Sequence, residues 1–319
     1  MTAPRDAVAR QAGARPRVGL ALGSGSARGW AHIGVIDALH KAGIEPDIIC
    51  GTSIGSLVGA AYVTGQLTPL KEFATSLTWR EIVGYLDVRL SGGGLIDGKQ
   101  IVKLLLRMKI DAKIEDCEKP FAAIATDLET GREIWLRNGS IDQAVRASIS
   151  LPGIFSPARL DERWLVDGGL VNPVPVSACR ALGADVVIAV NINGDIVEPL
   201  RSEPVKRVLG ITRPLPADFM KRLVGQIPEG IRAQAAAIAP SLLQSTPSKP
   251  TYFDVLANSI NIMQDQITRS RLAGDPPHVM LMPRLRHIGL LEFNRAAEAI
   301  AEGEACVEHA LPALRRYLP

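Results

Sequence analysis

Three short glycine-containing segments carry the residues that could do chemistry in this chain. Residues 51–55 read Gly-Thr-Ser-Ile-Gly and place Ser53 between Gly51 and Gly55. An apolar segment precedes this pentapeptide and a helical pattern follows it, and a serine at such a strand–turn–helix junction is exposed for nucleophilic attack. The two glycines permit the sharp turn, and the free amides at the start of the helix add a positive potential. We interpret Ser53 as a nucleophile, with a close-packed turn of small residues as the alternative.

A second segment, residues 23–29, reads Gly-Ser-Gly-Ser-Ala-Arg-Gly and again follows an apolar run. Its glycine spacing differs from that of a dinucleotide-binding loop, and it lacks the Lys-Ser/Thr end of a Walker A loop. Backbone amides of small residues beside a nucleophile can stabilise the negative charge that develops on an attacked carbonyl oxygen. We therefore expect an oxyanion hole in this loop.

The third segment, residues 166–169, reads Val-Asp-Gly-Gly. Alone this pattern is typical of a turn, but beside the other two segments Asp167 can serve as the general base that takes the serine proton. A Ser-His-Asp triad is the competing interpretation, because Ser53, Asp167 and then His278 or His287 follow the chain order of α/β-hydrolases. An oxyanion loop of the His-Gly-Gly-Gly type, which would support the triad, is absent from the sequence.

Composition excludes several classes of protein. The 319 residues carry a net charge of only +3 and 4% aromatic residues, which excludes a dedicated nucleic-acid binder. The four cysteines have no metal-binding or redox spacing, and no cluster of ligating residues or calcium loop is apparent, so we expect reduced thiols, no metal and no cofactor. The N-terminus lacks the apolar stretch of a secretory signal. Residues 48–70 carry no charge, but their glycines and hydroxyls favour a buried strand and helix over a transmembrane span.

The elements that must position these segments alternate between strand and helix. Short apolar runs separated by helical patterns with short connections predict a parallel sheet and an α/β fold. We expect a flexible N-terminal arm over 1–16 and one α/β domain over 17–319, interrupted by a Pro-rich basic insertion at 195–250. The expected strands cover 18–22, 47–50, 121–126, 133–136, 164–166, 185–192 and 279–282, and the expected helices 29–42, 53–63, 97–108, 141–148, 174–181, 251–272 and 291–310, the last ending before Pro312.

Taken in order, the three segments resemble the patatin-like phospholipase family, specifically its short bacterial members. Residues 29–35, 146–148 and 151–155 support the resemblance, and residues 287–291 add a weaker likeness. It implies a three-layer sandwich with a central, mostly parallel sheet and helices on both faces. It also implies a Ser–Asp dyad of Ser53 and Asp167 without a histidine.

The same resemblance implies oxyanion donors at the backbone amides of Gly25, Ser26 and Arg28, and gives Gly168 and Gly169 as the glycines of the Asp-Gly-Gly motif. One feature departs from the family pattern, because Ser24 and Ser26 stand where the family has a run of glycines. A serine amide can still donate, so the hole remains chemically feasible. For Arg28 we favour a role in fixing the loop over contact with a lipid phosphate.

The implied function is that of a serine lipid acyl hydrolase, namely a phospholipase A, a lysophospholipase or an esterase acting through an acyl-enzyme. A catalytically weak, lipid-associated regulatory protein on the same fold is one alternative, and a triad esterase is another. The substrate would be a phospholipid or another acyl-ester lipid. Residues 201–236 mix apolar side chains with seven basic and three acidic ones, a pattern able to lie on an anionic lipid surface; a solvated surface insertion is the alternative. We expect a cytoplasmic protein, peripheral to the inner face of the membrane.

Overall fold

The computed structural model describes residues 15–85, 97–195 and 252–318, so that most of the predicted arm and insertion lie outside the described residues. The strands are β1 (Val18–Leu22), β2 (Ile48–Thr52), β3 (Phe121–Asp127), β4 (Glu133–Leu136), β5 (Ala158–Leu160), β6 (Arg163–Asp167), β7 (Val186–Val190) and β8 (Val279–Leu281). The α-helices are α1 (Ala31–Lys41), α2 (Ile54–Val63), α3 (Leu67–Ser76), α4 (Trp79–Tyr85), α5 (Lys99–Arg107), α6 (Ile141–Ser148), α7 (Val176–Ala181), α10 (Tyr252–Gly274) and α11 (Ala296–Leu314). Short 3-10 helices are η1 (Ser26–Trp30), η2 (Ile114–Asp116), η3 (Gly168–Leu170) and η4 (Phe293–Arg295).

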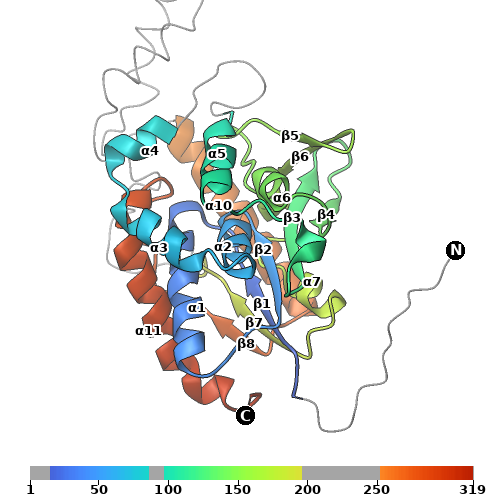
Figure 1. The fold of residues 1–319 in the computed structure, drawn as a ribbon, viewed down its shortest axis with the longest axis vertical. Helices are drawn as coiled ribbons and strands as arrows, with labels where there is room; N and C mark the ends of the chain where they lie inside the picture. Colours follow the sequence, from blue (N-terminus) through green and yellow to red (C-terminus); the bar gives the residue numbers. More distant parts are fainter. Residues whose placement is uncertain (1–14, 86–96, 196–251, 319) are drawn as a thin grey trace, which may run out of the picture.

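The eight strands form one sheet in the order β5-β6-β3-β2-β1-β7-β8, with β4 paired to β3 (Figure 1). Five neighbouring strands are mutually parallel, namely β3, β2, β1, β7 and β8. Strands β4 and β6 run antiparallel to β3. Leu20 and Leu22 of β1 pack in the cluster that holds α1, α2 and α11, and Ala21 between them packs with Cys179 of α7 on the opposite face. Helices therefore cover both faces, which explains the uninterrupted apolar runs of the central strands and confirms the predicted α/β sandwich.

Strand β3 aligns the two strands that end at the chemically interesting segments. Strand β2 pairs with β3 up to Thr52, which lies opposite Ile124. The antiparallel β6 ends at Asp167, which lies opposite Ala125, the next residue of β3. Because β4 occupies the other edge of β3 across Ala123–Thr126, β2 and β6 must share one edge and run toward each other along it. Their carboxyl ends meet there, so the register of three strands brings two distant points of the sequence together.

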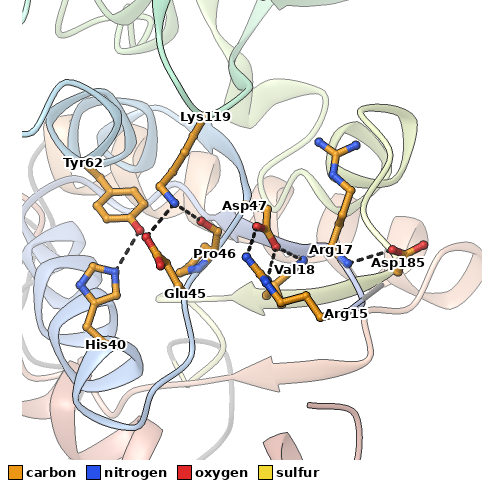
Figure 2. A network of polar contacts seen from close by, with 10 residues as sticks. All are labelled: Arg15, Arg17, Val18, His40, Glu45, Pro46, Asp47, Tyr62, Lys119 and Asp185. Carbon is orange, nitrogen blue, oxygen red and sulfur yellow. Dashed lines mark hydrogen bonds and ion pairs between the residues drawn. The ribbon is translucent and has the colours of Figure 1, made fainter. Parts of the chain in front are cut away.

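The opposite, amino end of the sheet carries a network of polar contacts between the residues that precede the strands (Figure 2). The Arg15 guanidinium donates two hydrogen bonds to the Asp47 carboxylate, at 2.9 and 2.6 Å, and the amide of Val18 donates a third at 2.8 Å. The Lys119 ammonium donates to Glu45 and to a backbone carbonyl, both at 3.0 Å. These contacts tie the starts of β1, β2 and β3 to one another.

Two sequence predictions about helices need comment. The expected C-terminal helix was to end before Pro312, but α11 contains this proline and begins later, at Ala296. Proline inside a helix removes one backbone hydrogen bond, and its ring crowds the carbonyl of the preceding turn. The fully buried Leu314 nevertheless keeps the last turn packed on the core. The uncharged stretch 48–70 forms β2 and α2, the predicted buried strand and helix, and then the start of α3, a helix that the sequence did not predict. Among the helices that the structure describes, none is long and apolar enough to cross a bilayer.

Candidate active site

Ser53 occupies the sharp turn between β2 and α2. Its backbone has φ 57° and ψ −125°, a conformation that a residue with a side chain rarely adopts. Glycine is needed on both sides, because a Cβ at Gly51 would lie 2.4 Å from the Gly55 carbonyl oxygen and one at Gly55 would lie 2.2 Å from that of Leu22. The strained turn raises the Ser53 side chain out of the sheet, where it remains partly exposed.

Asp167, at the end of β6, is the hydrogen-bond partner of the Ser53 hydroxyl. Ser53 Oγ donates a hydrogen bond to Asp167 Oδ2 at 2.5 Å, and the amide of Gly169 donates to Oδ1 at 2.7 Å. The aspartate is 1% exposed. Burial raises its pKa to about 6, although the hydrogen bonds from Ser53 and Gly169 act in the opposite direction. The carboxylate is therefore ionised at neutral pH, and it is also close to the pH at which it takes a proton.

The turn after Asp167 also passes very close to the backbone of a neighbouring strand. A Cβ at Gly168 would lie 2.2 Å from the carbonyl oxygen of Ile124, so the two glycines of the motif let the chain leave β6 against β3. Thr126 Oγ1 donates to the backbone oxygen of Asp167 at 2.8 Å. The aspartate is thus held on both its side chain and its backbone.

Ser148, at the end of α6, supports the nucleophile and was not singled out by sequence reasoning. Its Oγ accepts a hydrogen bond from the Ser53 amide at 2.9 Å and donates one to the Ile124 carbonyl at 2.6 Å. The serine therefore links the nucleophile turn to β3. The signal in the sequence was the segment 146–148, which supported the family resemblance without indicating a role.

The predicted oxyanion loop lies beside the dyad. Gly25 and Ser26 line the same pocket as Ser53 and Asp167, and neither amide has an acceptor in the part of the chain that the structure describes. In a 3-10 helix each amide points at the carbonyl three residues back, so within η1 the amide of Arg28 is directed toward Gly25. The structure thus brings Gly25 and Ser26 to the nucleophile, whereas Arg28 lies one turn further on and is 2% exposed.

Side chains behind the loop hold its carbonyls. His32 Nε2 donates to the Gly23 carbonyl oxygen at 2.8 Å, and Asn193 Nδ2 donates to that of Ser24 at 3.0 Å. Burial lowers the pKa of His32 to about 4, although the bond to Gly23 acts in the opposite direction, so the ring is neutral and bonds as a donor. Burial also lowers the pKa of Arg28 to about 10, and nearby Asp195 opposes this shift, so its guanidinium stays charged.

A deep apolar pocket opens at Ser53. It contains about 1240 Å³ of space between atoms, including its open mouth. Leucine, isoleucine and phenylalanine side chains from α2 to α5, from the segment after α6 and from the segment before η4 supply most of the wall, and the polar groups gather at the dyad, the loop and α10. The arrangement can hold an alkyl chain with its polar end at the Ser53 hydroxyl.

The histidines that would complete a triad make other contacts. His278 Nδ1 accepts from the Val187 amide at 3.0 Å, near the start of β7, and His287 Nε2 pairs with Glu298 at 2.8 Å. Neither is among the residues that line the pocket. Asp167 is instead the titratable side chain that contacts the Ser53 hydroxyl.

Comparison with known proteins gives consistent matches. Residues 20–180 match the patatin-like phospholipase family. Uncharacterized NTE family proteins of Mycobacterium bovis and Mycobacterium tuberculosis are 34% identical over 331 residues, covering 93% of this chain and 92% of theirs. Lysophospholipase NTE1 of Pyricularia oryzae is 31% identical over 294 residues, covering 90% of this chain but 18% of that protein. Patatin-like phospholipase domain-containing protein 6 of Mus musculus is 34% identical over 182 residues, 55% of this chain and 13% of that protein.

Proposed function

This chain belongs to the patatin-like phospholipase family, and we propose that it is a serine lipid acyl hydrolase that uses Ser53 and Asp167 as a catalytic dyad. One observation carries the proposal: the 2.5 Å hydrogen bond from Ser53 Oγ to Asp167 Oδ2, between two residues that line a pocket with apolar walls. The bond aligns the nucleophile with its base, and the pocket fits the acyl half of a lipid ester.

The reaction follows from this geometry in two half-steps. Ser53 Oγ attacks the acyl carbonyl carbon while its proton passes to Asp167 Oδ2, and the intermediate expels the alcohol, which takes that proton. Water then gives a proton to the freed carboxylate and attacks the acyl-serine, and Ser53 regains a proton as the fatty acid leaves. An aspartate with a pKa of about 6 suits both directions of transfer near neutral pH.

The carbonyl oxygen of the tetrahedral intermediate needs hydrogen-bond donors. We assign this role to the amides of Gly25 and Ser26, which line the pocket beside the nucleophile without a partner among the described residues. Each such donor is worth roughly 10²-fold or more in rate. The Arg28 amide remains a predicted third donor, and its side chain remains a predicted support of the loop.

The substrate class we propose is a phospholipid or lysophospholipid. The apolar pocket supports an acyl chain, and two of the relatives are called lysophospholipase or phospholipase domain-containing. We further propose that residues 17–319 form one catalytic unit that reaches lipid at a membrane surface. The predicted docking segment, 201–236, lies outside the described residues, so this last step rests on its charge pattern alone.

The test combines covalent labelling with turnover. A fluorophosphonate probe should label the purified protein and the Ser76→Ala control, in which an exposed hydroxyl is removed, but not Ser53→Ala. A panel of phosphatidylcholine, lysophosphatidylcholine and short p-nitrophenyl esters should release fatty acid only with the proteins that the probe labels. Equal labelling of Ser53→Ala, with circular dichroism unchanged, would move the nucleophile elsewhere. Labelling without turnover of any ester would favour the regulatory alternative.

A further inference from the structure

Helix α10 presents two polar side chains to a pocket whose walls are mostly apolar. Asn261 and Gln264 both line it, and they are 4% and 5% exposed. Residues three apart on a helix lie on the same face as close neighbours. The two amides therefore reach the pocket together, from a part of the chain that neither the motifs nor the family resemblance indicated.

Gln264 already has partners. Its Oε1 accepts from Ser24 Oγ at 3.0 Å and from Asn193 Nδ2 at 3.4 Å. Its Nε2 lies 2.3 Å from where a Cβ of Gly169 would be, so it packs directly on the turn after the catalytic aspartate. Gln264 thereby joins α10 to the oxyanion loop and to the Asp167 turn, and Asn261 lies one helical turn away on the same face of α10 and lines the same pocket.

Asn261 has an uncommitted donor. Its Nδ2 is buried and has no hydrogen-bond partner in the ranges that the structure describes. A buried polar group without a partner is destabilising and uncommon. An amide nitrogen can only donate, so the group that would complete it is an acceptor oxygen of a molecule in the pocket.

We propose that Asn261 determines specificity by donating a hydrogen bond from Nδ2 to an oxygen on the alcohol side of the substrate, on the carbon next to the one that bears the scissile ester. This proposal rests on the proposed hydrolase function. Glycerolipids carry such an oxygen as a free hydroxyl in monoacyl lipids or as a second ester in diacyl lipids. Esters of simple alcohols lack it, and they would leave the donor unpaired, which is how a polar site rejects an analogue without the matching group.

Binding of uncleavable ether lipids tests the proposal without depending on turnover. Three 1-O-alkyl phosphocholines of one chain length are compared below their micelle concentration: one with a 2-hydroxyl, one 2-deoxy and one 2-O-acetyl. The unsubstituted protein should bind at least one of the oxygenated lipids about tenfold more tightly than the 2-deoxy lipid, the size of one neutral hydrogen bond. The tighter of the two oxygenated lipids identifies the acceptor.

Asn261→Leu removes the donor at similar volume and should erase this preference, with the Kd of the 2-deoxy lipid changed less than about twofold. Asn258→Leu is the matched control, because Asn258 lies one turn earlier on α10, partly exposed and outside the pocket lining. It should retain the preference. If the unsubstituted protein binds all three lipids equally, or binds none, the proposal is wrong, whether or not the variant folds.

Hydrolysis separates this role from two other outcomes. On a p-nitrophenyl ester of the same chain length, which has no neighbouring oxygen, Asn258→Leu should keep kcat/KM within about threefold. Asn261→Leu should lose more of its kcat/KM on glycerolipid esters than on this ester. An equal loss on every ester with unchanged lipid preference would make Asn261 an oxyanion donor and overturn the proposal. If the preference is found but the unsubstituted protein cleaves no ester, Asn261 keeps its binding role and the hydrolase function fails instead.

Discussion

The two ends of the sheet surround their aspartates with opposite environments. At the amino end Asp47 accepts three hydrogen bonds, two of them from a guanidinium, and the contacts around it join the starts of three strands (Figure 2). At the carboxyl end Asp167 is buried without a cationic partner among the described residues and holds the hydroxyl of a strained serine. Buried donors or acceptors without partners also occur at this end, on His32, Asn193 and Asn261.

The difference separates residues that stabilise the fold from residues that carry out the proposed reaction. Ligands of open α/β sheets bind at the carboxyl ends of the strands, and a reactive site needs unsatisfied donors and a base whose pKa is near neutral. Backbone strain of this kind costs about 1–3 kcal/mol. The amino end has no such demand, so its charges are paired. The comparison predicts that substitutions at the two ends will separate activity from stability.

The largest expected effect is on activity. Asp167→Asn keeps the shape of the side chain but cannot take the serine proton, so kcat/KM should fall about 10³-fold or more. Asp47→Asn should keep kcat/KM within about threefold at 25 °C, because it lies at the other end of the sheet. In the unsubstituted enzyme kcat/KM should decline below about pH 6, where Asp167 becomes protonated. Stopped assays of one soluble ester between pH 4.5 and 8.5 measure all three.

Two outcomes would contradict the division. A folded Asp47→Asn protein with as large a loss as Asp167→Asn would show that the amino end takes part in catalysis. A pH profile that stays flat through pH 6 would remove Asp167 as the base. Loss of activity in His278→Ala or His287→Ala equal to that in Ser53→Ala would replace the dyad by a triad.

The second prediction concerns stability, and the two aspartates should give opposite signs. Burial raises the pKa of Asp167 to about 6, so the folded state binds its proton more tightly than the unfolded chain. This contribution is present below about pH 4 and is lost as pH rises through 6. The amide of Asp167→Asn does not ionise, so this variant avoids that loss. Its free energy of unfolding should exceed that of the unsubstituted protein by up to roughly 3 kcal/mol at pH 8 and differ little near pH 4.

Asp47 has the reverse behaviour. Partial burial acts to raise its pKa, but the hydrogen bonds from Arg15 and Val18 outweigh this and hold it below the ordinary value. Its contribution to stability is present above the pKa of the unfolded chain and is lost as pH falls through the pKa of the folded state. Asp47→Asn should therefore lower the free energy of unfolding by about 1–3 kcal/mol at pH 7 and by progressively less below pH 4. Urea unfolding from pH 3 to 8 measures both variants, and equal signs at pH 8 would refute the comparison.

The sequence predicted the central sheet because its signals were local, and the motifs with the family resemblance predicted that Ser53 and Asp167 would lie together. Leu20 and its neighbours read as a buried strand, and the glycines around Ser53 and Asp167 mark turns that only close backbone approach explains. The same local reasoning misjudged Pro312, where packing of Leu314 outweighs the helix-ending preference of proline.

The sequence could not predict the roles of Ser148, Asn261 and Gln264, for a different reason. Each is an ordinary polar residue on a helix, and its role appears only when β3, α6 and α10 are packed together. Gln264 meets Ser24 across 240 positions of the chain. No periodicity or spacing encodes such a contact, so the walls of the site could not be predicted although its centre could.

The smallest expected effect tests whether the loop carries avoidable strain. Ser26 has φ 55°, a left-handed conformation that glycine adopts without cost and serine does not. Ser26→Gly should therefore leave turnover unchanged or raise it by up to about threefold. Relief of strain is offset by the greater freedom of glycine in the unfolded chain, so stability should change by about 1 kcal/mol or less. Ser26→Ala is the matched control, because it also removes the hydroxyl but keeps the Cβ. Both variants retain the backbone amide that we assign to the oxyanion. If both lost activity equally, the Ser26 hydroxyl would be the functional group, and the loop would act through its side chain rather than through its backbone.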